Sequence, residues 1–331
     1  MDTRLTIKLQ VLFTFIYVVP FYLSPATRPS PQLTRDAPSC IRARVRAVTF
    51  SSVLSLALTV LVLHQYGSVP PQEILRLIGF WPISLFDTAK TMLLVVILFA
   101  GPLFEYGIVE NGLKDWVRGR GMYEVLSSWM GYRNYVVVRL RPSRINANQT
   151  HKVQGPVSEE LIWRSLIIPL HVVSHFSGKQ IIFLTPLYFG IAHVHHLYEF
   201  RLTHAHTPLL MALARTIFQF TYTSLFGFFA AFVYIRTGNL LSVILAHSFC
   251  NWMGLPRLSG RVGVEAGVPI GPPGAGKRDD DDDDYPRYES RGVIWTVAYY
   301  ALLVAGAVGF YWQLFPLTES SHALPVVLTE Q

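Results

Sequence analysis

Residues 156–164 read PVSEELIWR and introduce an apolar run that continues to Leu170. Pro156 suits the first turn of a helix, and the positive end of the helix dipole favours acidic side chains there. The stretch therefore predicts a helix that begins near Pro156. Its charged residues, Glu159, Glu160 and Arg164, need an explanation because the helix is otherwise apolar enough for a lipid environment.

The spacing of these three charges separates their roles. Glu160 and Arg164 stand four residues apart with the acid first, so their side chains share one helix face and can pair. Such a pair fits either a helix-start signal or a functional site, and both interpretations stay open. Glu159 is rotated away from this face. An unpaired carboxylate at membrane depth is costly and usually functional, so Glu159 is the stronger candidate for chemistry.

The composition indicates a membrane protein. Of the 331 residues, 51% are hydrophobic and only 15% are charged, whereas soluble domains carry about 25% charged residues. The net charge of +7 comes from basic residues scattered over loops. This pattern favours a positive-inside bias over nucleic-acid binding. Two cysteines, Cys40 and Cys250, are too few for a disulfide framework.

About eight apolar stretches approach the length of roughly 17–25 residues that a membrane-spanning helix needs. They are residues 5–24, 47–64, 84–106, 157–176, 179–196, 208–235, 240–254 and 293–315. The sequence thus predicts an all-α, polytopic membrane protein. The first stretch is long, contains Pro20 and lacks a clear small-residue cleavage site, so we expect a retained anchor rather than a signal peptide.

The loops predict the orientation of these helices. Residues 25–46 and 107–156 are rich in arginine and lysine. They follow the first and third stretches and so lie on one side, which the positive-inside rule assigns to the cytosol. The N-terminus is then expected in the lumen. The fourth stretch begins on the cytosolic side, and the fifth and seventh end there.

This topology brings polar residues of three stretches to one membrane depth. Phe189 and His193 are four residues apart near the end of the fifth stretch, and His247 and Asn251 share a helix face in the seventh. Alone, each could be a packing residue or a polar contact between helices, and the neighbouring His195 and His196 could be interfacial. Together with Glu159 they suit the activation of water. The carboxylate accepts a proton, and imidazole and amide donors stabilise an oxyanion.

Four regions follow from these patterns. Residues 1–127 are expected to hold the N-terminal helices and basic cytosolic loops, and residues 128–256 the catalytic membrane core. Residues 257–292 are rich in glycine and proline and contain six consecutive aspartates, 279–284. We expect a disordered, solvated acidic loop there rather than a cation or partner site. Residues 293–331 are expected to form the last helix and a tail.

The three motifs, in this order, resemble those of the type II CAAX prenyl endopeptidases, a family of glutamate-dependent intramembrane proteases. The family pattern is EExxxR, FxxxH and HxxxN. The matching residues are Glu159, Glu160 and Arg164, then Phe189 and His193, then His247 and Asn251. The family runs almost directly from its RNYVV-like stretch into the glutamate motif, so residues 138–154 are an insertion or an unspliced intron.

The resemblance implies a multi-pass enzyme of the endoplasmic reticulum membrane whose active site faces the cytosol. Its substrates would be farnesylated or geranylgeranylated CaaX proteins, such as Ras-like GTPases, from which it removes the last three residues. By the same resemblance, Glu159 is the general base and His193 assists it. His247 and Asn251 hold the oxyanion, and Glu160, Arg164 and Phe189 support the site.

Three rival interpretations stay open on the residues alone. A zinc protease could use His193, His247 and Glu159 as ligands, although no HExxH motif is present. A thiol protease could use Cys250 as nucleophile and His247 as base. A proton-coupled transporter could use the same carboxylate and histidines as a relay. We predict an enzyme without a cofactor, with zinc as the alternative, and no nucleic-acid partner.

Overall fold

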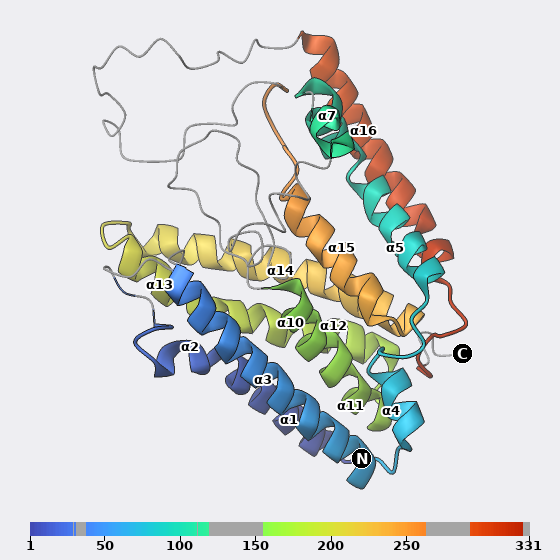
Figure 1. Cartoon of the computed structure of the whole chain (residues 1–331). Coiled ribbons are helices and arrows are strands. Elements are labelled where there is room, and N and C mark those ends of the chain that lie inside the picture. The colour runs from blue at the N-terminus through green and yellow to red at the C-terminus, as the bar shows by residue number, and fades with distance from the viewer. Residues whose placement is uncertain (29, 31–37, 111, 119–154, 263–291, 327–331) are drawn as a thin grey trace. The chain divides into compact units, whose positions relative to one another are not determined.

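The computed structural model describes residues 1–28, 30, 38–110, 112–118, 155–262 and 292–326 (Figure 1). These residues form helices joined by turns, with no strand among them. The predicted all-α class is therefore confirmed. The predicted insertion at 138–154, with Asn148 inside it, and most of the predicted acidic loop lie outside the described residues.

The chain divides into two compact units. The first comprises Met1–Leu93, Glu124–Trp252 and Phe315–Gln331, and the second Leu94–Tyr123 and Met253–Leu314. All the predicted site residues belong to the first unit. The four regions expected from the sequence were drawn from motifs and composition, and their boundaries stay a prediction.

The first unit contains the N-terminal helices and the three motifs. Its N-terminal part holds α1 (Thr3–Val18), α2 (Pro20–Leu23), α3 (Pro38–Gln65), α4 (Pro71–Leu77) and the first part of α5 (Leu85–Leu98). The motif-bearing part holds α10 (Pro156–Glu160), η2 (Leu161–Leu166), α11 (Ile167–Val173), α12 (Gly178–Ala192), η3 (His193–His195), α13 (His196–Thr203), α14 (Leu209–Thr237) and α15 (Leu240–Met253), and η4 (Pro316–Thr318) follows near the C-terminus. Figure 1 shows α1 and α3 side by side, in blue, with α12 packed along α14.

The second unit is smaller. It contains the end of α5, then α6 (Ala100–Phe104), η1 (Glu105–Val109), α7 (Leu113–Val117) and α16 (Val293–Gln313). The short α6 packs along α16, where the backbone of Gly306 lies close to the carbonyl oxygens of Ile97 and Leu98.

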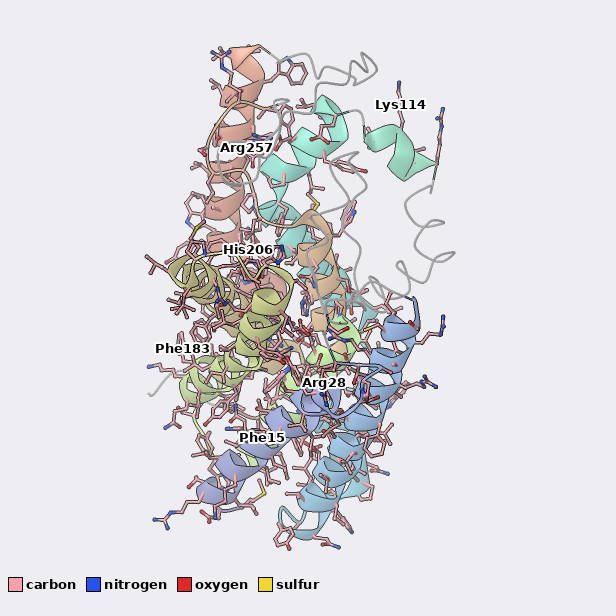
Figure 2. The ribbon with its side chains drawn as sticks, turned by 90° about the vertical axis from the view of Figure 1, so that its left-hand side faces the viewer. Phe15, Arg28, Lys114, Phe183, His206 and Arg257 are labelled. Carbon is pink, nitrogen blue, oxygen red and sulfur yellow. The ribbon has the colours of Figure 1, made fainter. Side chains whose placement is uncertain are left out.

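Several helices are long and apolar enough to cross a membrane. Among the described residues these are Thr3–Leu23, Ser39–Gln65, Gly178–Thr203, Leu209–Thr237 and Val293–Gln313, or six spans if the bent pair Leu85–Leu98 and Ala100–Val109 counts as one. Large apolar side chains such as Phe15 and Phe183 are exposed on these helices (Figure 2). Exposed apolar surface of this kind fits contact with lipid.

The predicted count of about eight spans is not confirmed. The stretch predicted at 240–254 forms α15, whose 14 residues extend only about 21 Å at 1.5 Å per residue, less than the roughly 30 Å of a bilayer's hydrocarbon core. The stretch predicted at 157–176 forms three short pieces, α10, η2 and α11, and carries three charged side chains. Both are elements that hold site residues.

The helix expected from PVSEELIWR begins at Pro156, as predicted. Gly155 precedes it, Pro156 takes the first helical position, and the amide of Glu159 donates to the carbonyl of Gly155 at 3.0 Å. After Glu160 the backbone widens into the π-helix η2. Short π segments are rare and are frequent at functional sites, so the irregular backbone coincides with the charged motif.

Glycines allow α12 and α14 to approach each other closely. A Cβ atom on Gly227 would lie 2.6 Å from the Cβ atom of Pro186, and one on Gly190 would overlap the hydroxyl oxygen of Ser224. Small residues at such crossings are typical of packed membrane helices. This contact fixes the C-terminal half of α12, which carries the second motif.

Candidate active site

Glu160 joins the first and third motifs. Its Oε1 atom accepts hydrogen bonds from Nη1 of Arg164 at 3.1 Å and from Nδ1 of His247 at 2.6 Å. Glu160 and Arg164 are fully buried, and His247 is buried as well. The pair expected from the four-residue spacing is therefore present. The bond to His247 was not foreseen from the sequence, and it ties α10 to α15.

Glu159 is buried but lacks the partners that its neighbour has. Its side chain is 1% exposed, and its Oε2 atom lies 3.8 Å from Nε2 of His247. Within the described part of the chain, neither of its carboxyl oxygens has a hydrogen-bond partner. A buried polar group without a partner costs free energy. Such an arrangement leaves the Glu159 carboxyl group, which lies beside the Tyr17 hydroxyl, able to bind a water molecule or a substrate.

The His247 ring lies between the two glutamates. Because a carboxylate can only accept, the contact with Glu160 places a proton on Nδ1 of His247. The other ring nitrogen, Nε2, then faces Glu159. The ring also packs against Phe226 of α14, with centroids 4.4 Å apart. These contacts fix the direction in which Nε2 can act.

Phe189, the aromatic residue of the second motif, contacts residues of all three motifs. The guanidinium carbon of Arg164 lies 4.5 Å from its ring centroid, and the rings of His193 and His247 lie 4.6 Å and 6.4 Å away. A guanidinium over an aromatic face is attracted by the ring electrons. Phe189 therefore supports the charged motif and links His193 to it.

His193 lies at the end of α12, where the chain tightens into η3. Its Nδ1 atom is 2.7 Å from the carbonyl oxygen of Phe189. A carbonyl only accepts, so the proton is on Nδ1 and the lone pair is on Nε2. That tautomer lets His193 accept a proton or orient a water. Its connection to the other motif residues runs through the ring of Phe189.

Asn251 follows His247 by one turn of α15. Its Nδ2 atom is buried and has no hydrogen-bond partner among the described residues. A residue that served only to join two helices would use this donor on a neighbour. The amide is instead available to a group that enters the site.

Sequence reasoning missed two aromatic residues near the site. Phe226 of α14 contacts His247 and lies 5.7 Å from the Arg164 guanidinium carbon. Tyr17 of α1 packs edge-on against Trp163 and lies near Glu159. Neither carries a signal in the sequence, because each belongs to a helix with many aromatic residues and is brought to the site only by long-range packing.

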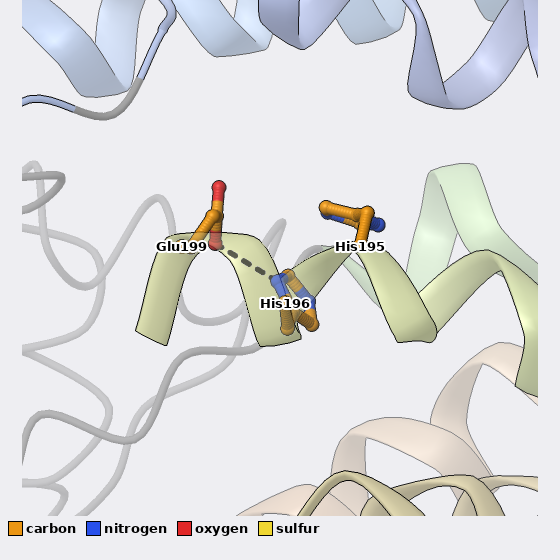
Figure 3. A group of neighbouring side chains, drawn as sticks. All are labelled: His195, His196 and Glu199. Atoms are coloured by element: carbon orange, nitrogen blue, oxygen red, sulfur yellow. Dashed lines mark hydrogen bonds and ion pairs between the residues drawn. The ribbon is translucent and has the colours of Figure 1, made fainter. Parts of the chain in front are cut away.

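Among the residues that the structure describes, one group of side chains has the geometry to hold a metal ion. Potential ligand atoms of His195, His196 and Glu199 lie within 4.8 Å of one another (Figure 3). The His196 side chain is buried within the protein. The ligand set considered for zinc, namely His193, His247 and Glu159, does not form such a group in the part of the chain that the structure describes.

Comparison with known proteins gives a family match over the part of the chain that holds the motifs. A family model described as type II CAAX prenyl endopeptidase Rce1-like matches residues 152–253, which contain all seven motif residues. A probable CAAX prenyl protease 2 of Schizosaccharomyces pombe is 34% identical over 254 residues, or 76% of this chain and 81% of the relative. The chain belongs to this family. The family match thus extends beyond the motifs to most of the sequence.

Two further relatives support the assignment. A CAAX prenyl protease 2 of Homo sapiens is 34% identical over 68% of this chain and 64% of the relative. One of Saccharomyces cerevisiae is 27% identical over 88% and 89%. No solved structure was found to match the chain.

Family membership confirms the resemblance drawn from the three motifs and makes the chain a membrane peptidase. The thiol-protease and transporter interpretations are not favoured. The family-model match begins at residue 152, so it leaves out all but the last three residues of the predicted insertion at 138–154.

Proposed function

We propose that this protein hydrolyses the peptide bond after the prenylated cysteine of CaaX proteins and releases the last three residues. The substrates would be farnesylated or geranylgeranylated proteins such as Ras-like GTPases. The observation that carries the proposal is the buried carboxyl group of Glu159, unpartnered among the described residues and 3.8 Å from His247. The names of the family and of the relatives supply the substrate class.

In this mechanism Glu159 takes a proton from water, and Nε2 of His193 orients that water. The resulting hydroxide attacks the scissile carbonyl carbon, which forms a C–O bond and a tetrahedral oxyanion. The C–N bond then breaks, and Glu159 returns the proton to the departing amine. The products are the prenyl-cysteine carboxylate and the free tripeptide, and the protein is unchanged.

His247 and Asn251 would stabilise the oxyanion. The Asn251 amide donates from Nδ2, which is buried and unpartnered in the described chain. His247 already donates from Nδ1 to Glu160, so it can donate from Nε2 only as an imidazolium. Donors placed in advance around a developing negative charge are a large source of rate enhancement.

The same proposal places the enzyme in the endoplasmic reticulum membrane with its active site open to the cytosol. The basic loops at 25–46 and 107–156 support this orientation through the positive-inside rule. No cofactor is needed in the mechanism, because the Glu159 carboxylate carries the proton, His193 orients the water, and His247 and Asn251 stabilise the oxyanion.

The direct test is hydrolysis of a farnesylated CaaX peptide by detergent-purified protein, with the same peptide lacking the prenyl group as control. We expect release of the free tripeptide from the prenylated peptide only. Cys250→Ala should keep its activity per folded molecule, and activity should survive 1,10-phenanthroline. Loss of activity in the first case would support a thiol nucleophile, and in the second a catalytic zinc ion.

A further inference from the structure

Three buried polar side chains, joined by hydrogen bonds, lie next to His193. Nη2 of Arg44 donates to Oε1 of Glu199 at 2.9 Å, and Nδ1 of His196 donates to Oε2 of the same carboxylate at 2.9 Å. Figure 3 shows the second of these bonds within α13. One carboxylate thus holds a cation from α3 and a histidine that stands three residues after His193.

Residues of the N-terminal part of the protein hold Arg44 in place. Nε of Arg44 donates to the carbonyl oxygen of Thr27 at 3.0 Å, and its guanidinium carbon lies 5.5 Å from the ring centroid of Phe21. Exposed fractions of the side chains are 10% for Arg44 and 1% for Glu199. A buried ion pair adds little net stability because both charges lose their hydration. We therefore infer that this ion pair has a role other than stabilising the fold.

His196 connects the ion pair to the active site. Its ring lies 5.8 Å from the ring of His193 at an angle of 68°, an edge-to-face contact. Between the two residues the backbone forms the 3-10 turn η3, which ends α12 and starts α13. Fixing His196 therefore fixes both the turn that carries His193 and one side of the His193 ring.

We propose that Arg44, Glu199 and His196 are positioning residues for His193. Arg44 anchors Glu199, Glu199 orients the His196 ring through Nδ1, and His196 holds the His193 ring so that its Nε2 atom stays directed at the reacting water. The inference rests on the proposed function for the role of His193. It gives Arg44 of α3, which lies outside the three motifs, an indirect role in catalysis.

His196 and Glu199 also belong, with His195, to a group of potential metal ligands. The Arg44 guanidinium, 2.9 Å from Glu199, opposes a second positive charge at this carboxylate. Positioning is therefore the function that the contacts favour, and metal binding is an outcome that the experiment must detect.

The experiment compares three variants with wild type in the peptide assay. Glu199→Gln removes the charge at nearly constant size. His196→Phe keeps a ring beside His193 but loses the bond to Glu199, and His196→Asn keeps a donor near the Nδ1 position but loses the ring. We expect Glu199→Gln to lower kcat per folded molecule by about 10-fold to 100-fold, since small misplacements of catalytic groups cost this much, with little change in KM.

Both His196 variants should lower kcat, because each keeps only one of the two contacts. In a His193→Ala background, Glu199→Gln should cause no further loss, because it acts through His193. The matched control is Glu105→Gln. It breaks another partly buried pair, Arg257–Glu105 at 2.9 Å in the second unit, and should change melting without changing kcat.

A second readout does not depend on the substrate. Diethyl pyrocarbonate modifies accessible imidazole nitrogens, and mass spectrometry gives the rate at each histidine. His193 should react at a different rate in Glu199→Gln than in wild type, while the exposed His64 and His206 react equally in both. If wild type fails to cleave the peptide but this difference is found, the proposed function fails and the positioning role stands.

Two results would overturn the inference. The first is a Glu199→Gln protein with wild-type kcat per folded molecule and an unchanged rate of His193 modification, even if it melts earlier. The second is a stoichiometric metal ion in purified wild type that is absent from Glu199→Gln, because the residues would then be ligands.

Discussion

At the scale of single residues, two adjacent glutamates have opposite surroundings. Glu159 lacks hydrogen-bond partners among the described residues, whereas Glu160 accepts from both Arg164 and His247. Sequence spacing predicted the pairing of Glu160 with Arg164, because positions four apart share a helix face. It could not predict the bond to His247, which joins residues 87 positions apart.

The contacts of Glu160 predict a combined effect on stability and activity. Glu160→Gln keeps an oxygen acceptor but removes the negative charge that pairs with the buried Arg164, and breaking a buried pair typically costs about 3–5 kcal/mol. We expect a lower melting temperature in detergent and a lower kcat, because His247 loses its orientation. Arg164→Lys should also lower the melting temperature and kcat, since an ammonium cannot reproduce the stacking of the guanidinium on Phe189. A Glu160→Gln protein with normal melting would contradict this account of the pair.

The oxyanion role of Asn251 predicts a specific kinetic pattern. Asn251→Ala should lower kcat by about 10² to 10³, the usual cost of one lost oxyanion donor, with a modest change in KM. Asn251→Asp should be at least as damaging, because it removes the donor and adds negative charge beside the oxyanion. Melting curves measured alongside give the folded fraction. Normal kcat per folded molecule in both variants, with reduced yield, would assign Asn251 to helix packing instead.

At the scale of helices, apolar runs predicted where most elements lie but not where they break. The run at 179–196 became α12 and η3, with the turn at His193 that directs this residue into the site. The π-helix η2 follows the charged motif. Such irregularities depend on tertiary contacts, for example Arg164 stacking on Phe189. These breaks cannot be predicted from the residue types of a local stretch alone.

The close crossing of α12 and α14 predicts that a single methyl group is harmful. Gly227→Ala would place a Cβ atom 2.6 Å from that of Pro186, and overpacking of this kind costs about 1–3 kcal/mol. Gly292→Ala is the control, because its Cβ atom would meet nothing within 4 Å. Thermal melting in detergent should show a loss for the first variant and little for the second. Equal melting of both would show that the helices separate easily.

At the scale of the whole molecule, composition predicted a polytopic helical protein, and the family comparisons agree. The number of spans was harder to predict. A length and hydropathy pattern cannot distinguish a spanning helix from a short element such as α15, which carries His247 and Asn251 but has only 14 residues. The ion pair between Arg44 and Glu199 was also beyond prediction, because 155 residues separate its partners.

The predicted orientation can be tested with a glycosylation sequon. Asn148, Gln149 and Thr150 match the acceptor pattern, in a loop outside the described residues that we expect in the cytosol. The site should stay unmodified in cells. A mobility shift that glycosidase treatment and Asn148→Gln both remove would place this loop in the lumen and reverse the orientation.

The central claim is that the Glu159 carboxylate activates the water that cleaves a prenylated CaaX peptide. Glu159→Gln tests it most directly, because the amide keeps the size of the side chain but cannot take a proton from water. The account predicts a protein that melts as wild type does, or higher since a buried unpartnered charge is gone, and that releases no tripeptide from the farnesylated peptide. A folded Glu159→Gln protein that turns over at the wild-type rate would contradict it.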